Sequence, residues 1–134
     1  MQIGQIIWEF LRSAFVFFFG AANKLLFVLV AVAALDYVTG VSAAIRTKKV
    51  SSKIGAKGII KKIMMFAVVS LSHLMDEIIL SSESPAEMLQ TITTLFYISN
   101  ESISVLENVA ETGLNIPQKL KDLIAKLRDS VRKI

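Results

Sequence analysis

Residues 25 to 62 constrain this chain more than any other part of it. An almost unbroken apolar run covers residues 25–45, which is 21 residues, and it carries a single acid, Asp36. A helix needs about 20 mostly apolar residues to cross the ~30 Å hydrocarbon core of a bilayer. The run leads into residues 46–62, which hold no acid and seven cations: Arg46, Lys48, Lys49, Lys53, Lys57, Lys61 and Lys62. A cation-rich connection directly after a span is typical of the cytoplasmic side, so the sequence predicts an integral membrane protein.

The composition agrees with a membrane location and excludes several chemistries. The 134 residues are 54% hydrophobic, against roughly 45–50% in soluble domains. The chain has no cysteine, which excludes a disulfide framework, thiol catalysis and a thiolate metal site. The basic segment lies between two apolar runs, so anionic lipid headgroups suit it better than nucleic acid, and no nucleic-acid partner is expected.

The N-terminal segment, residues 1–24, is aromatic and helical by pattern. No cation precedes its apolar core, so a cleaved signal peptide is not expected. Glu9 and Arg12 stand at i and i+3, where they can pair. The clean apolar stretch after Arg12 is too short to cross a bilayer, which favours an interfacial helix. The competing interpretation is a first span with that pair buried among partner helices; the N-terminus would then lie inside rather than outside.

Two further apolar segments follow the basic one. Residues 63–80 and 88–106 are predicted to span the membrane, and residues 81–87 to form an external loop between them. The last segment is the least hydrophobic. From Gln90 to Asn108 its polar residues recur at steps of 4, 3, 4, 3 and 4, which places them on one helical stripe. This polar stripe, predicted to face the lumen of an assembly, comprises Gln90, Thr94, Tyr97, Glu101 and Ser104.

The three predicted spans differ in how readily they would insert. A central Asp costs about 2.5–3.5 kcal/mol, and each strongly apolar residue contributes about −0.3 to −0.6 kcal/mol. The first span holds eleven Leu, Ile, Val or Phe residues, so it tolerates Asp36. The third has few strong hydrophobes and holds Glu101 well inside. It is stable in lipid only if its stripe faces other helices or water, which predicts a chain prone to assemble.

The remaining segment, residues 107–134, is predicted to be a cytoplasmic tail. Thr112 and Gly113 end the preceding helix as a C-cap, and Pro117 opens a last helix as its first residue. That helix alternates apolar and basic positions and is amphipathic. The expected fold is therefore an all-α membrane protein with three transmembrane helices, an N-terminal interfacial or fourth spanning helix, and a C-terminal basic amphipathic helix.

Asp36 has two interpretations that the sequence leaves open. It can pair with a lysine or a tyrosine hydroxyl of a neighbouring span, or it can line an aqueous path, since acids inside membranes are functional by default. Gly40 and Ala44 form a small-xxx-small step beside it that permits close helix approach. The predicted helix-packing and oligomerisation face is Asp36, Tyr37, Gly40 and Ala44.

Catalysis and cofactors find little support. His73, Asp76 and Glu77 have a spacing found among metal ligands, but no second ligand pair completes a site. There is no phosphate-binding loop, and the chain has one histidine. A proton or ion pathway is chemically conceivable, although 134 residues leave little room for the broken helices of a transporter. No enzyme activity, metal or cofactor is expected.

Three blocks of sequence resemble a bacteriophage holin family that includes the toxin-secretion holins of clostridia. The first is DYVTGV at residues 36–41 with SSKIG at 51–55 and KGIIKK at 57–62. The second is FYISNE at 96–101 with SVLEN at 104–108, and the third is GLNIPQKL at 113–120. The resemblance covers roughly residues 25–128.

The resemblance implies a small multi-pass protein of the bacterial inner membrane. Such proteins accumulate harmlessly and then form homo-oligomeric lesions that release an endolysin or a toxin, without needing to contact it. Membrane lipids and other copies of the chain are the expected partners. The alternatives are a small regulatory or scaffold membrane subunit, including an antiholin, and a selective ion channel.

Overall fold

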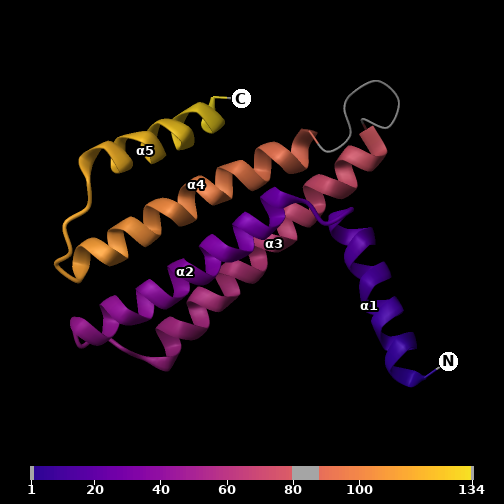
Figure 1. Cartoon of the computed structure of the whole chain (residues 1–134), viewed down its shortest axis with the longest axis horizontal. Coiled ribbons are helices and arrows are strands. Elements are labelled where there is room, and N and C mark those ends of the chain that lie inside the picture. Colours follow the sequence, from indigo (N-terminus) through magenta and orange to yellow (C-terminus); the bar gives the residue numbers. More distant parts are fainter. Residues whose placement is uncertain (1, 80–87, 134) are drawn as a thin grey trace.

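The computed structural model describes residues 2–79 and 88–133, and all of their regular structure is helical. The helices are α1 (Ile3–Phe19), α2 (Lys24–Arg46), α3 (Ser52–Ile79), α4 (Met88–Glu111) and α5 (Gln118–Arg132). α2, α3 and α4 run side by side, α1 leaves them at an angle, and α5 folds back along α4 (Figure 1). The all-α prediction is confirmed for the described residues, and the predicted external loop at 81–87 lies outside them.

Short polar residues and one glycine set the ends of the helices. The Asn23 side chain accepts a hydrogen bond from the Leu26 amide at 2.9 Å and caps α2, and Ser51 Oγ accepts from the Ile54 amide at 3.2 Å ahead of α3. Gly113 has φ +88°, the left-handed conformation that ends α4 as predicted. Pro117 occupies the N-cap of α5 rather than its first helical position.

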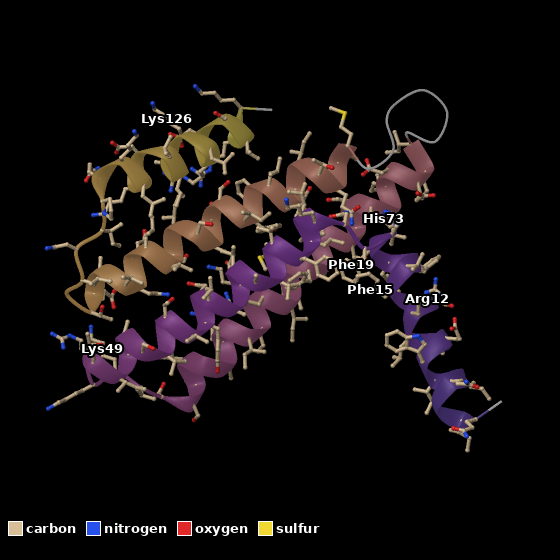
Figure 2. The ribbon with its side chains drawn as sticks, viewed as in Figure 1. Arg12, Phe15, Phe19, Lys49, His73 and Lys126 are labelled. Carbon is tan, nitrogen blue, oxygen red and sulfur yellow. The ribbon has the colours of Figure 1, made fainter. Side chains whose placement is uncertain are left out.

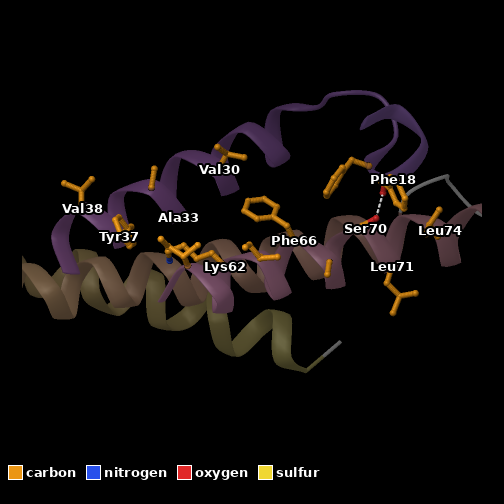
Figure 3. Close-up of a pocket in the computed structure, with 15 residues that line it drawn as sticks. Phe18, Val30, Ala33, Tyr37, Val38, Lys62, Phe66, Ser70, Leu71 and Leu74 are labelled. Carbon is orange, nitrogen blue, oxygen red and sulfur yellow. Dashed lines mark hydrogen bonds between the residues drawn. The ribbon is translucent and has the colours of Figure 1, made fainter. Parts of the chain in front are cut away.

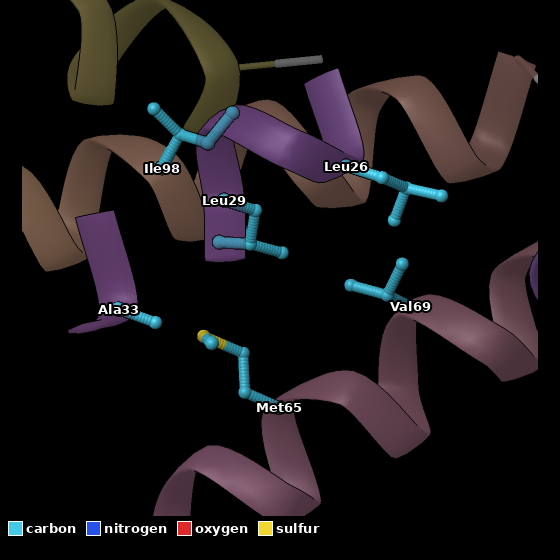
Figure 4. Close-up of a cluster of buried hydrophobic side chains, with 6 residues drawn as sticks. All are labelled: Leu26, Leu29, Ala33, Met65, Val69 and Ile98. Carbon is cyan, nitrogen blue, oxygen red and sulfur yellow. The ribbon is translucent and has the colours of Figure 1, made fainter. Parts of the chain in front are cut away.

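α4 is the centre of the bundle. α2 and α3 each pack mainly against α4 and touch one another only slightly. An apolar cluster fills the space between the three helices near the end where α1 joins (Figure 4), and it consists of Leu26, Leu29, Ala33, Met65, Val69 and Ile98. Outside this cluster, many of the buried residues are polar.

Polarity in this bundle is reversed relative to a soluble domain. The polar and charged residues that are buried come from α3 and α4: Ser70, His73, Asp76, Gln90, Thr94, Ser99 and Glu101. The outer faces carry large apolar side chains instead, such as Phe27 at 65% exposure and Ile63 at 57%. Soluble monomers rarely expose apolar patches of this extent, so the outer surface is suited to lipid.

Among the described helices, α2 is long and apolar enough by composition to cross a membrane. α3 and α4 are long enough but more polar, so composition alone does not establish the three predicted spans. The described α1 has no buried residue. Its predicted Glu9–Arg12 pair is present at 3.6 Å, and Phe15 and Phe19 stack at 5.3 Å near its junction with the bundle (Figure 2).

The predicted basic loop at residues 46–62 is wrong in its second half. α3 begins at Ser52, so Lys53, Lys57, Lys61 and Lys62 lie on its first turns, while Lys48 and Lys49 lie in the short α2–α3 connection, at the end of the molecule marked by Lys49 in Figure 2. The start of an apolar run indicates where a helix could enter the hydrocarbon core. The helix itself can begin earlier, and here it begins next to its cap, Ser51. For the same reason α4 continues past residue 106 to Glu111.

Candidate functional site

One charged residue from each of the three packed helices meets the others inside the bundle. The Lys62 ammonium of α3 lies 2.7 Å from Asp36 Oδ2 of α2, and it also donates to the carboxylate of Glu101 of α4. The side chains are 18% exposed for Lys62 and Asp36 and 8% for Glu101. We call these three residues the ionic cluster. Burial of a charge is tolerated where a partner compensates it in this way.

The ionic cluster lies at a single depth. Each member is ten positions from the helix end beside the basic segment: Asp36 from Arg46, Lys62 from Ser52, and Glu101 from Glu111. At 1.5 Å per residue this is about 15 Å along each helix axis. Unpaired, these charges would be the least tolerated part of each helix in lipid.

Asn108 of α4 adds neutral hydrogen bonds to the cluster. Its Nδ2 donates to Asp36 Oδ1 at 2.9 Å and lies 3.1 Å from both the Asp36 carbonyl oxygen and Thr39 Oγ1. Asn108 packs beside Gly40, where a Cβ would lie 3.4 Å from Asn108 Nδ2. Asp36 is therefore held by two helices at once.

The cluster has one cation for two carboxylates, and further cations lie beside it. A cavity of about 480 Å³ between α3, α4 and α5 is lined by Glu101 and Glu107 together with Lys61, Arg128 and Arg132. The Arg132 guanidinium also lies 6.0 Å from the centre of the Phe96 ring. The helix α5 thus places basic groups against the acidic half of α4.

Two other polar residues of the bundle attach α1. Ser70 Oγ donates to the Phe18 carbonyl oxygen at 2.8 Å, and Gln90 Nε2 donates to the Phe19 carbonyl oxygen at 2.8 Å. The last carbonyl groups of a helix have no intrahelical partner. α3 and α4 therefore supply the partners that the end of α1 lacks, which fixes the point from which α1 departs.

Asp76 of α3 caps α4 from a neighbouring helix. Its two carboxylate oxygens accept hydrogen bonds from the backbone amides of Leu89 and Gln90, each at 2.9 Å. A negative charge at a helix N-terminus is favourable, because the first amides are otherwise unpaired and the dipole is positive there. Both oxygens of Asp76 are thereby engaged. Within residues 2–79 and 88–133, no group of three His, Cys, Asp or Glu is placed to hold a metal ion.

The bacteriophage holin family matches residues 13–129 of the chain. The chain belongs to this family. It is 33% identical over 115 residues to a probable holin of Bacillus phage phi105, covering 86% of this chain and 82% of the phage protein. It is also 36% identical over 129 residues to an uncharacterized 14.9 kDa protein of Clostridium perfringens, with 95% and 96% of the two chains covered. No solved structure matches it.

Membership of the holin family confirms the resemblance seen in the sequence. It implies a bacterial inner-membrane protein and suggests one that is not an enzyme. The YqxH protein of Bacillus subtilis is a further relative, 32% identical over 124 residues, which are 92% of this chain and 85% of that protein.

The four residues of the predicted packing face of this holin-family chain all line one groove. Asp36, Tyr37, Gly40 and Ala44 line a groove of about 310 Å³ between α2 and the first turns of α3. Within the single chain, Gly40 approaches Asn108 and Asp36 pairs with Lys62. Pairing with a lysine of a neighbouring segment is thus the observed interaction of Asp36, and a part of this face in oligomerisation stays a prediction.

The predicted polar stripe of the holin-family chain faces other helices of the same chain. Gln90, Thr94 and Glu101 are buried, and Tyr97 and Ser104 are half-buried in the wall of the 480 Å³ cavity. Thr94 Oγ1 donates to the Gln90 carbonyl oxygen at 2.6 Å, within its own helix. α2, α3 and α5 pack against α4, and Gln90 donates to the Phe19 carbonyl oxygen at the end of α1. Its exposure to a lumen stays a prediction about the assembled state.

Several contacts that organise the site were not predicted from the sequence. Lys62 was assigned to the basic loop, so its partnership with Asp36 and Glu101 was missed. Asp76 was considered with His73 and Glu77 for metal spacing, and its role as a cap of α4 was not predicted. The contact of Ser70 with α1 was not predicted either. Asn108 was recognised from its spacing as the last position of the polar stripe, but its hydrogen bonds to Asp36 and Thr39 were not predicted.

Proposed function

We propose that the chain is a holin that accumulates in the bacterial inner membrane and then assembles into lesions large enough to release an endolysin, or a toxin in a secretion system. The reversed polarity of the bundle carries this proposal. Lys62 is paired with Asp36 and Glu101 inside the chain, while large apolar side chains cover the outer faces of α1, α2 and α3. Such a monomer can reside in lipid without harm and still contains the polar surface that a water-filled lesion needs.

We propose that α2, α3 and α4 all cross the membrane. α2 inserts by composition, whereas α3 and α4 become compatible with lipid when Lys62 and Glu101 are paired. The cations of residues 46–53 mark the cytoplasmic end. α1 lies at the opposite interface or forms a fourth span. A cysteine introduced at Gln2 distinguishes these, since the chain has none: labelling from outside supports the interfacial helix, and labelling from inside the span.

Lesion formation then requires the polar stripe to turn from the interior of one chain toward a shared lumen. Like-charge repulsion between the basic ends of neighbouring copies opposes close assembly. The membrane potential is a suitable trigger, because moving one charge through 100 mV is worth ~2.3 kcal/mol. Once copies assemble despite this repulsion, polar groups that were paired within one chain pair instead with neighbouring chains and with water.

Timed expression in bacteria together with a cytoplasmic endolysin tests this function. The proposal expects abrupt lysis after a delay, without any other phage protein. Unchanged permeability and continued growth would contradict it and favour an antiholin or a scaffold subunit. Discrete unitary currents without passage of a folded enzyme would favour a selective channel.

A pair of substitutions tests the stripe. Thr94→Leu with Glu101→Leu should delay or abolish lysis, because a lumen cannot be lined by leucine at those positions. Thr91→Leu is the matched control, since Thr91 lies on the exposed face of the same helix. Unaltered timing in the stripe variant would assign that face to helix packing alone.

A further inference from the structure

A long apolar groove runs along the outside of the bundle between α2 and α3. The two helices pack on α4 and diverge from each other, and they leave an open cavity of about 900 Å³ (Figure 3). Val30, Ala33 and Tyr37 line it from α2, and Phe66 and Leu71 from α3. Phe18 and Phe19 of α1 close one end. The groove follows α3 from Ile59 to Leu74, which is about 22 Å at 1.5 Å per residue.

The other end of this groove leads toward the basic end of the molecule. The cavity of about 310 Å³ shares Tyr37 and Lys62 with the apolar groove and continues to Lys49 and Ser51. Gly55 and Gly58 of α3 also line this cavity, and its wall is thin there because glycine has no side chain. The two cavities therefore adjoin at Tyr37 and Lys62. The longer cavity is apolar, and the shorter one carries cations at the end that we call the mouth.

The cations at this mouth differ in whether they are paired. Lys62 is engaged by Asp36 and Glu101. Across residues 2–79 and 88–133, Lys49 and Lys61 form no ion pair, and both line the mouth. A groove with an apolar trough and unpaired ammonium groups at one end is complementary to a molecule with a hydrocarbon chain and an anionic head.

We propose that this groove binds one anionic phospholipid, with an acyl chain between α2 and α3 and its phosphodiester headgroup beside Lys49 and Lys61. The site rests on the proposed insertion of α2 and α3. A length of about 22 Å exceeds the ~15 Å of one hydrocarbon leaflet, so the groove can enclose an acyl chain. A second copy of this chain is a poorer occupant, because copies with the same orientation bring their basic ends together.

Fluorescence quenching by brominated lipids tests the site. In a Trp8→Phe background, Phe66→Trp places a probe in the groove and Phe27→Trp places one on the 65% exposed outer face of α2. Each variant is placed in vesicles of phosphatidylcholine that contain brominated phosphatidylglycerol or brominated phosphatidylcholine at equal fraction. Val30→Trp, also in the groove, replaces the first probe if that variant does not fold.

The groove probe should be quenched more by the anionic lipid, with a relative association constant about fivefold higher for each lysine, which corresponds to about 1 kcal/mol per cation. The outer probe should be quenched equally by both lipids. Lys49→Gln with Lys61→Gln should abolish the preference. Lys53→Gln with Lys57→Gln removes the same charge from positions that do not line the groove and should keep most of it.

Equal quenching of the groove probe by both lipids would overturn the proposal, as would an equal effect of the two lysine pairs. A groove probe that is not quenched while the outer probe is quenched would also overturn it, and is the result expected if a second copy fills the groove. Absence of quenching at both probes would instead contradict the insertion of α2, and the lipid site would fall with it.

Discussion

Lys62 is the residue on which the interior of this bundle depends most. It is the cation that pairs with both Asp36 and Glu101, which come from different helices. Removing one partner from a buried ion pair is expensive because the remaining charge is left uncompensated. The two carboxylates would then repel one another inside the bundle, in addition to losing their hydrogen bonds.

Lys62→Met should therefore lower the free energy of unfolding in detergent by about 3–5 kcal/mol. Lys57→Met is the control, because Lys57 is an exposed cation on the same helix, and it should change stability by less than about 1 kcal/mol. Adding Asp36→Asn and Glu101→Gln to Lys62→Met should recover most of the loss. A triple variant no more stable than the single one would show that the charges are not what Lys62 compensates.

Gly40 lies where α2 approaches Asn108 of α4 beside the cluster. A Cβ there lies in ordinary contact with Asn108 Nδ2 at 3.4 Å, so Gly40→Ala should be tolerated. Gly40→Leu should displace Asn108 and cost about 1–3 kcal/mol of stability, as overpacking does. Thermal unfolding of both variants in micelles measures this. Equal stability of the alanine and leucine variants would contradict the close approach of the two helices.

At this scale the sequence predicted one side of the interaction. Asp36 was recognisable because it interrupts an apolar run, and pairing with a lysine was one of its two interpretations. The partner was not recognisable, because Lys62 belongs to a cation-rich segment that has a sufficient explanation at the membrane surface. Which of seven cations turns inward depends on the packing of α3 on α4, and a single sequence does not contain that information.

Asp76 shows how one helix stabilises another in this fold. Its carboxylate accepts hydrogen bonds from the backbone amides of Leu89 and Gln90 in the first turn of α4. Asp76→Ala should cost about 1–2 kcal/mol, the range for loss of an N-cap, and should speed hydrogen exchange at those two amides. Glu77→Ala, at the exposed neighbouring position, should leave both unchanged. Unaltered exchange at Leu89 and Gln90 in the first variant would rule out the capping role.

The helix α5 cannot keep its present position while α4 spans a membrane. It lies along the acidic half of α4 with Lys119, Lys121 and Lys126 exposed, and each cation at the bilayer centre costs about 2.5–3.5 kcal/mol. We therefore expect α5 to leave α4 for the membrane surface, where its amphipathic pattern is favourable.

A reversible crosslink between α4 and α5 tests this movement. Ala110 and Ala125 line one cavity of about 350 Å³ between the two helices. Cysteines at both positions, joined in cells by a reducible thiol crosslinker, should delay or prevent lysis, and reduction should restore it. The two single-cysteine variants, treated alike, are the controls. Normal lysis by the crosslinked chain would mean that α5 does not have to move.

The helical elements themselves were largely predictable. Long apolar runs indicated α2 and most of α3, periodic patterns indicated the other helices, and Thr112-Gly113 indicated the end of α4, because these are local signals. The start of α3 was misplaced because the end of an apolar run was taken as the end of a helix. The path of α5 back along α4 depends on contacts between Arg132 and Phe96 and on Val131, which is buried, and such contacts between distant residues have no signature in a single sequence.

At the scale of the whole molecule, the holin-family chain keeps two groups of polar side chains inside its helical bundle. The ionic cluster neutralises three charges inside the bundle. Nearer α1, the Ser70 hydroxyl and the Gln90 amide hold the end of α1, and the Asp76 carboxylate caps α4. The outer apolar surface makes this arrangement compatible with lipid. The central claim is that the same polar stripe that packs inside the monomer lines the lesion after assembly.

Accessibility of residue 94 tests that claim most directly. Thr94 is 1% exposed in the single chain, and Thr94→Cys introduces the only thiol, because the chain has no cysteine. Val28→Cys, on the outer face of α2, is the control and should stay unlabelled throughout. A membrane-impermeant maleimide should leave Thr94→Cys unlabelled in growing cells and should label it once collapse of the membrane potential triggers lysis. Release of endolysin with Thr94→Cys still unlabelled would contradict the account.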